Sequence, residues 1–293
     1  MFTRTRLVGL VMLFFATAVP TQAQTTLRYK FKPGDKLAYA VENKMSMKLD
    51  VGGKEMEMAV SQMMELAWNV ESVGSDGKAM IQQKITRIQF AMDGLGGKLQ
   101  YDSAEGKLPG GPLSDTAGPI LKALSGLEVS LSMDPRGEIR DVKVPPAFLK
   151  TLKDNGGGVE DMFNEDAMKK MIGQASLAFP KEALAKGKTW NQKLSMKAPF
   201  GEMRMDNLYT YDGAVQKGDK KLEQISVRPT ITLKTDDNVS AAMNLKDGGG
   251  KGVAYFDNDA GRLVEMNTTQ NMTMEAAGQS IRLVQNISMK LKE

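Results

Sequence analysis

Apolar and polar residues alternate along one long stretch of the chain, from Met56 to Val70. The even positions are apolar except for one glutamine, whereas the odd positions include Glu57, Glu65 and Asn69. A period of two predicts a strand with one buried face and one solvent face. At ~3.3 Å per residue such a strand is roughly 50 Å long, which indicates a curved or barrel-like sheet with a bulge near Met63 and Met64.

Similar alternation predicts further long strands, which short turns separate. Because the connecting turns are short and rich in Gly and Asp, neighbouring strands are expected to be antiparallel. A proline within one of these strands, Pro229, predicts an edge position or a bulge there. The further strands cover Met45–Val51, Ile225–Leu233, Val264–Met274 and Ile281–Leu291.

The middle of the chain departs from this pattern. Leu99–Pro112 is rich in Gly and Pro, and Ile120–Leu124 then reads as a short helix that ends at Gly126. A second short helix is predicted at Pro146–Leu152, and Asp161–Ile172 has helical spacing of its apolar residues. These segments either cover one face of the sheet or form a mobile lid over a cavity.

Short motifs recur at two places and predict a duplicated strand meander. We therefore expect a mainly β fold with long antiparallel strands in a half-barrel or curved sheet and two or three short helices on one face. The hairpin motif begins at Met45–Leu49 and Leu194–Ala198, its first strand returns as the final strand at Ile287–Leu291, and the turn motif occurs at Met133–Ile139 and Phe256–Leu263. The expected organisation is one β-rich domain over 24–293, with pseudo-repeats at 27–144 and 180–293 joined by a helical segment at 145–179.

The first 23 residues have the pattern of a signal peptide. Arg4 and Arg6 precede an apolar stretch that is shorter than the ~20 residues of a spanning helix. Small residues then mark a cleavage site before Gln24. The mature protein is expected to be exported, periplasmic or secreted, without a transmembrane segment.

Composition restricts the chemistry. The chain has no histidine and no cysteine, which excludes Ser-His-Asp and Cys-His catalysis and ordinary zinc sites. Without Arg4 and Arg6, the 39 basic residues become 37 against 35 acidic ones, a net charge of +2. No basic face is evident either, so we expect no nucleic-acid partner. Because histidine and cysteine are missing, we expect no cofactor, no metal and no enzymatic activity.

Methionine supplies the candidate site. Several of the 22 methionines lie two apart within predicted strands, so that their side chains share one face. Such a face is either core packing, a flexible wall that binds an apolar ligand, or, more remotely, a Cu(I) site. The candidate ligand groove consists of Met45, Met47, Met56, Met58, Met64, Leu66 and Trp68.

Two strand entries, Gly34-Asp35 and Gly187-Lys188, accompany long Met- and Thr-rich strands and a late Asp…Gly hairpin. In these features residues 27–293 resemble a family of exported bacterial β-rich proteins of unassigned function. Long strands with helices set across them also resemble half-barrel lipoprotein carriers and related lipid-binding envelope proteins. The resemblance implies a fold and carries no known chemistry.

These observations predict a non-catalytic exported envelope protein that binds a lipid or another apolar or amphiphilic ligand in the Met-lined groove. The alternative is a structural or protein-interaction module without a ligand cavity, whose partner would be an envelope protein. An open inner face would distinguish the two.

Overall fold

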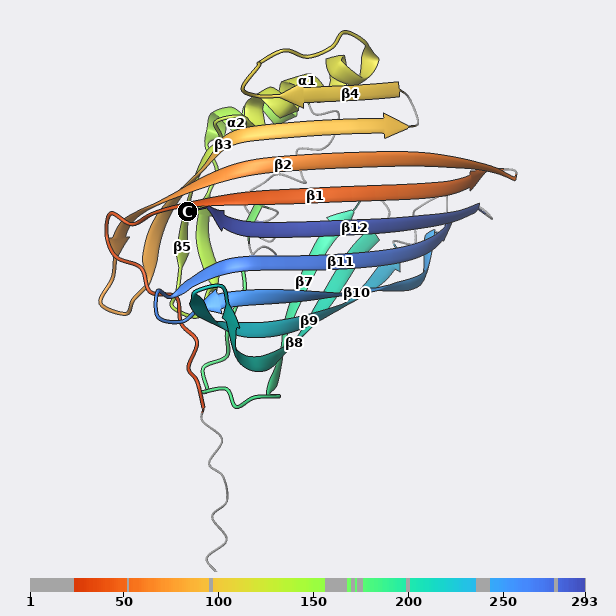
Figure 1. Cartoon of the computed structure of the whole chain (residues 1–293). Coiled ribbons are helices and arrows are strands. Elements are labelled where there is room, and N and C mark those ends of the chain that lie inside the picture. Colours follow the sequence, from red (N-terminus) through yellow and green to blue (C-terminus); the bar gives the residue numbers. More distant parts are fainter. Residues whose placement is uncertain are drawn as a thin grey trace, which may run out of the picture.

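The protein is built around one long, curved antiparallel sheet, as the computed structural model shows (Figure 1). The structure describes residues 24–51, 53–94, 97–155, 168–169, 172, 176–198, 201–235, 243–276 and 279–292. The predicted signal peptide lies outside these residues. The sheet is open, and its strand order is β6-β5-β3-β2-β1-β12-β11-β10-β9-β8-β7, with β4 paired to β3.

Most of the described strands are longer than the usual five or six residues, and β4, β5 and β6 have the usual length. In the first half they are β1 (Lys36–Val51), β2 (Lys54–Val73), β3 (Ala79–Gly94), β4 (Gly97–Asp102), β5 (Glu128–Met133) and β6 (Ile139–Lys143). In the second half they are β7 (Thr189–Ala198), β8 (Gly201–Lys217), β9 (Lys220–Thr235), β10 (Met243–Asp257), β11 (Arg262–Ala276) and β12 (Gln279–Lys292). The expected mainly β fold with an open, curved sheet is confirmed.

Two helices have described bounds, α1 (Pro112–Leu124) and α2 (Pro146–Asn155). They lie together beside β3 and β4 at one side of the sheet (Figure 1). The first helix is longer than predicted because Pro112 can occupy the first turn, where no backbone N–H is needed. Of the third predicted helix, Met168, Lys169 and Ile172 are helical, and the rest lies outside the described residues.

The sheet differs from the sequence prediction at two places. The Gly/Pro-rich stretch after Leu99 contains the end of β4, which pairs with β3. Pro229 lies in β9, an interior strand between β8 and β10, so its predicted edge position is wrong. The strand tolerates the missing N–H because the β9–β10 pairs pass from Val227 to Thr230 without a pair at Pro229.

The two meanders that the sequence treats as repeats meet at the centre of the sheet. Strand β12 lies between β1 and β11, so that the first and last strands of the described chain are neighbours. On one side of β12 the order is β6-β5-β3-β2-β1, and on the other side it is β11-β10-β9-β8-β7. Across the sheet, both meanders therefore run from their last strand to their first. The duplication and its boundaries stay a prediction.

One face of the sheet carries most of the core, and we call it the inner face. Tyr39 pairs with Leu66 and with Leu291, and alternation places all three side chains on this face. Leu121 of α1 and Leu152 of α2 belong to the same buried cluster. The helices therefore pack on the inner face, where α1 contacts β3 and β4.

Glycines in β10 allow its neighbours to approach closely. A Cβ atom at Gly252 would lie 2.5 Å from the Asn267 carbonyl oxygen and 2.7 Å from a Val227 methyl group. No other residue could occupy this position without moving the backbone of β11.

Candidate functional site

An apolar cavity of about 280 Å³ lies between the inner face and the elements that cover it. Strands β12, β1, β2, β3, β5 and β6 of the sheet form one wall, and the end of α1 with Met168, Ile172 and Ser176 forms the other. This volume is at the lower end of the range for ligand pockets, about 300 to 1,000 Å³. The described lining residues are Val41, Gln62, Met64, Leu66, Trp68, Gln83, Ile85, Leu124, Leu127, Val129, Ile139, Met168, Ile172, Ser176 and Met289.

None of these described lining residues is charged. Three of them carry polar groups without a hydrogen-bond partner in the described part of the chain: the Gln62 and Gln83 amides and the Trp68 Nε1–H. Gln83 and Trp68 are a directly paired couple on β3 and β2, and 9% and 6% of their surfaces are exposed. The Ser176 Oγ, by contrast, donates to the Gly137 carbonyl oxygen at 3.1 Å. The cavity is thus apolar with a few neutral hydrogen-bonding groups.

The absence of charge extends along the inner face of the four central strands. In these strands, over 37–49, 56–70, 266–274 and 281–291, no inward-facing position carries a charged residue. Every charged residue there lies at a position that alternation assigns to the outer face. Where polar residues do face inward, they include a row of uncharged amides across the sheet, in which Gln285 donates to Asn43 at 3.0 Å. We call this the amide row, which is interrupted at Gly250 and Pro229: Gln62, Asn43, Gln285, Gln270, Asn207 and Gln192.

An open groove of about 690 Å³ lies between the two edges of the sheet, and we call it the edge groove. One wall is the turn before β6 with the start of that strand, and the other is β7 with Trp190. Residues 176–180 cross between these walls: the Phe179 N–H donates to the Arg136 carbonyl at 2.7 Å, and the Trp190 Nε1–H to the Ala178 carbonyl at 2.8 Å. The edge groove adjoins the cavity at Ile139 and Ser176, which line both.

A glycine is required where this segment crosses the turn. Gly137 has a φ of +89°, a left-handed conformation that other residues rarely adopt. A Cβ atom there would lie 2.5 Å from the Leu177 carbonyl oxygen and 2.6 Å from the Tyr29 ring. The close approach of 176–180 to the turn therefore depends on Gly137.

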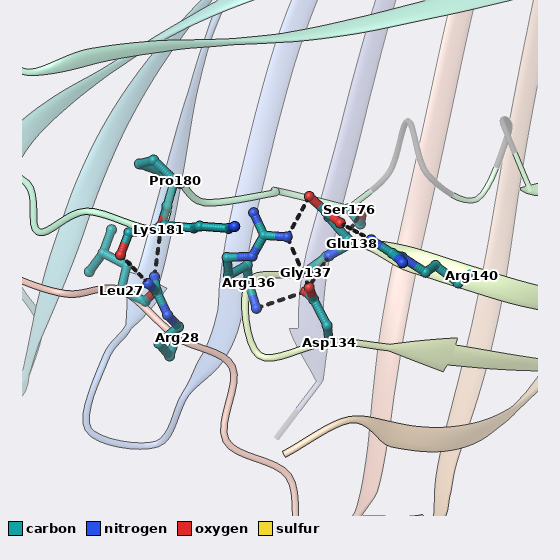
Figure 2. Close-up of polar contacts among 10 residues, drawn as sticks. All are labelled: Leu27, Arg28, Asp134, Arg136, Gly137, Glu138, Arg140, Ser176, Pro180 and Lys181. Carbon is teal, nitrogen blue, oxygen red and sulfur yellow. Dashed lines mark hydrogen bonds and ion pairs between the residues drawn. The ribbon is translucent and has the colours of Figure 1, made fainter. Parts of the chain in front are cut away.

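Charged residues at the rim of the edge groove are paired with one another (Figure 2). The Arg136 guanidinium contacts Asp134 at 3.2 Å and Glu138 at 2.7 Å, and Arg140 contacts Glu138 at 2.8 Å. The hydrogen bond from Arg140, with the charges of both arginines, holds the pKa of Glu138 below its usual range. The arginines of this rim are therefore already neutralised by carboxylates.

Buried tyrosines pack beside the cavity. Tyr39 contacts the Trp68 ring with 5.1 Å between centroids, and Tyr209 stacks on Trp190 at 5.3 Å. Burial raises the pKa of Tyr209 to about 12 and raises that of Tyr39 further. These phenols stay neutral at physiological pH and add no charge to the inner face.

The residues of the predicted groove share one face, and the structure divides them into two groups. Met64, Leu66 and Trp68 line the cavity. The others lie along the same face toward the β1–β2 turn, where register pairs Met45 with Val60 and Met47 with Met58. This second group, Met45, Met47, Met56 and Met58, is half-buried and lies outside the cavity lining.

Several cavity residues were missed in the sequence. Gln83 and Ile85 come from β3, whose alternation of Ile81, Gln83 and Ile85 could have identified an inward face. Val129 lies at the start of the short strand β5, and nothing in its local pattern places it next to Gln83 in the sheet. Its contribution depends on the tertiary fold.

Comparison with known proteins identifies the family. A family model described as a family of unknown function, DUF6263, matches residues 76–276. The chain belongs to this family. No curated protein sequence matches the chain.

Among solved structures, the fold is similar to that of lipovitellin, in a structure titled for its lipid–protein interactions. The TM-score is 0.52 at 12% identity, and the match covers 90% of this chain and 26% of the lipovitellin chain. The chain thus spans about a quarter of lipovitellin, and the likeness concerns the fold alone.

Two other matches are too distant to support an argument. An outer membrane channel from Pseudomonas putida F1 has a TM-score of 0.25 at 6% identity, covering 90% of this chain and 97% of the other. A DUF1329 family protein from Desulfovibrio piger has a TM-score of 0.15 at 11% identity, with 86% and 85% covered.

The described residues contain no cluster of three or more acidic residues that could hold a metal ion. In the same part of the chain, no helix combines the length and hydropathy needed to cross a bilayer.

Proposed function

We propose that this protein is a non-catalytic, exported envelope protein that binds an apolar or amphiphilic ligand in the cavity beside Trp68. The observation that carries the proposal is the cavity itself, which is lined mostly by apolar side chains on an inner face without charge. A site of this kind favours ligands that leave water through the hydrophobic effect.

The edge groove supports this proposal by supplying a route to the cavity. It is open, it adjoins the cavity at Ile139 and Ser176, and it lies where the sheet is not closed. The longer part of an amphiphile can remain in this groove while one end enters the cavity. The small volume of the cavity is compatible with such partial burial.

The fold comparison supports the same class of ligand. Lipovitellin, whose structure is titled for lipid–protein interactions, has a similar fold over 90% of this chain. The basic and apolar N-terminal pattern supports export, because Arg4 and Arg6 precede the apolar stretch as in a signal peptide.

The proposal is tested by binding of N-phenyl-1-naphthylamine, an uncharged fluorophore that brightens in apolar surroundings. Titration of the mature protein should give saturable binding with one site per chain. Organic extraction of the purified protein, followed by mass spectrometry, should recover a co-purified lipid. A lack of saturable fluorescence together with an extract free of lipid would reject the proposal and favour a purely structural role.

A pair of variants on α1 localises the binding. Leu124→Trp enlarges a half-buried residue of the cavity wall and should reduce probe affinity at least tenfold. Leu113→Trp changes the same residue type on the same helix outside the cavity lining and should leave affinity within twofold. Equal affinities for both variants would place the probe elsewhere.

A further inference from the structure

We infer that the cavity selects ligands whose buried end is an uncharged hydrogen-bonding group, a hydroxyl or an ester carbonyl, and that Gln83 is the residue that binds it. This inference rests on the proposed function and adds a ligand class to it. Fatty alcohols and fatty esters should therefore bind better than ionised fatty acids.

Gln83 has the properties of a ligand-binding group. Its side chain is on the inner face of β3, lines the cavity and is only 9% exposed. Its amide has no hydrogen-bond partner among the described residues. The amide lines the cavity, so a molecule bound there can supply the hydrogen bonds that the described residues do not.

Neighbouring groups offer hydrogen bonds of the same neutral kind. The indole of Trp68, the direct register partner of Gln83, has a buried Nε1–H without an acceptor in the described structure. Gln62 adds a second amide to the lining. An amide both donates and accepts, which suits a hydroxyl, and two N–H donors suit a carbonyl oxygen.

A carboxylate fits the cavity poorly. Its buried charge would need a cation, and no described lining residue carries one. In the adjoining edge groove, Arg136 and Arg140 are already paired with Asp134 and Glu138, and the exposed Lys169 lines the groove and not the cavity. A carboxylate inside the cavity would thus lose its hydration without gaining a counter-charge there.

The experiment compares ligands of equal chain length as competitors of N-phenyl-1-naphthylamine. Below their aggregation concentrations at pH 8, 1-dodecanol and methyl dodecanoate should displace the probe at concentrations at least tenfold lower than dodecanoate. The apparent affinity of dodecanoate should rise as the pH is lowered and its carboxyl group becomes protonated. Equal displacement by alcohol and carboxylate at pH 8 would overturn the inference.

Variants then assign the role to Gln83. Gln83→Leu should weaken 1-dodecanol about tenfold, the effect expected from loss of one or two hydrogen bonds, while affinity for the probe is kept. Gln83→Met provides a second apolar substitution of similar size, should the branched side chain impair folding. Gln100→Leu, on the exposed surface of β4, is the matched control and should change neither ligand.

The outcomes separate the two proposals. If the wild-type protein does not bind the probe, the proposed function fails. If it binds the probe, but Gln83→Leu and Gln83→Met leave the preference for 1-dodecanol unchanged, the function stands and the role of Gln83 is wrong. In that case Gln83 contacts only water in the cavity.

Discussion

The inner face has two halves with the same alternating sequence pattern and different surroundings. On one side of the amide row lies the cavity half, with Trp68 at 6% and Tyr39 at 1% exposure, where the end of α1 lines the cavity together with Trp68. On the other side lies the methionine half: Met45, Met47, Met56, Met58, Met196, Met203, Met205, Met272 and Met274.

The difference between the halves lies in residue type and burial. In the cavity half, rigid aromatic rings contact one another and leave a defined volume. In the methionine half, Met272 and Met274 are buried, whereas Met47 and Met58 are half-buried and Met196 is 38% exposed. Alternation thus determines which face a residue occupies, and the elements packed on that face determine whether it becomes core or a cavity wall.

The largest expected difference between the halves is in their contribution to stability. Trp68→Ala should reduce the free energy of unfolding by about 3 to 5 kcal/mol, because it removes a buried ring and its contact with Tyr39. Urea unfolding followed by circular dichroism measures the change. A loss below about 1 kcal/mol would mean that the cavity half is loosely packed around Trp68.

Alkaline pH should destabilise the cavity half selectively. Burial raises the pKa of Tyr209 to about 12, whereas an unfolded tyrosine ionises near 10. Its folded pKa is the higher one, so the stabilisation is fully present below pH 10 and is lost as the pH rises toward 12. For this one residue, the free energy of unfolding should fall by about 2 to 3 kcal/mol.

Tyr209→Phe tests the assignment because it keeps the ring that stacks on Trp190 and removes the ionisable group. Between pH 9 and pH 11.5 the variant should lose less stability than the wild type in urea unfolding. If the free energy of unfolding depends on pH in the same way in both proteins, Tyr209 ionises without unfolding the region.

A polar substitution in the methionine half should have a smaller effect. Met58 is half-buried, so that an aspartate at this position keeps access to water. We expect Met58→Asp to cost about 1 kcal/mol, near the average for point substitutions. Met58→Leu serves as the control, and global unfolding by Met58→Asp would show that the methionine half is closed core.

Much of the fold, and less of the site, could be predicted from the sequence. The period-two pattern from Met56 to Val70 identified β2 and its inner face, including Leu66 and Trp68. Gln83 could not be identified as a binding group, because the alternation that places it on the inner face of β3 gives no sign of a cavity there. Its importance depends on the register with Trp68.

The edge groove could not be predicted from the sequence, and the reason is geometric. Its walls, the turn near Arg136 and the strand around Trp190, are far apart in the chain and meet only because the sheet curves. Pro229 illustrates the same limit, since a gap in the β9–β10 pairing allows it in an interior strand. The local sequence pattern predicts strands and helices, whereas register and sheet curvature determine which side chains face one another.

The smallest expected effect is chemical and leaves the fold intact. Limited oxidation by hydrogen peroxide converts accessible methionines to sulfoxides, and the rate follows exposure. Met196, at 38% exposure, should be oxidised first, followed by half-buried Met47 and Met58. Met133 and Met289, at 0% and 5% exposure, should be protected.

Peptide mass spectrometry over a time course gives the rate at each position, with free methionine as an internal reference. A ligand bound beside Trp68 should further protect Met289, which lines the cavity, and should leave Met196 unchanged. Equal protection at both positions would mean that the ligand covers the whole inner face. Faster oxidation of Met133 than of Met196 would contradict the division into two halves, because it would require the core beneath β5 to open before the methionine half reacts.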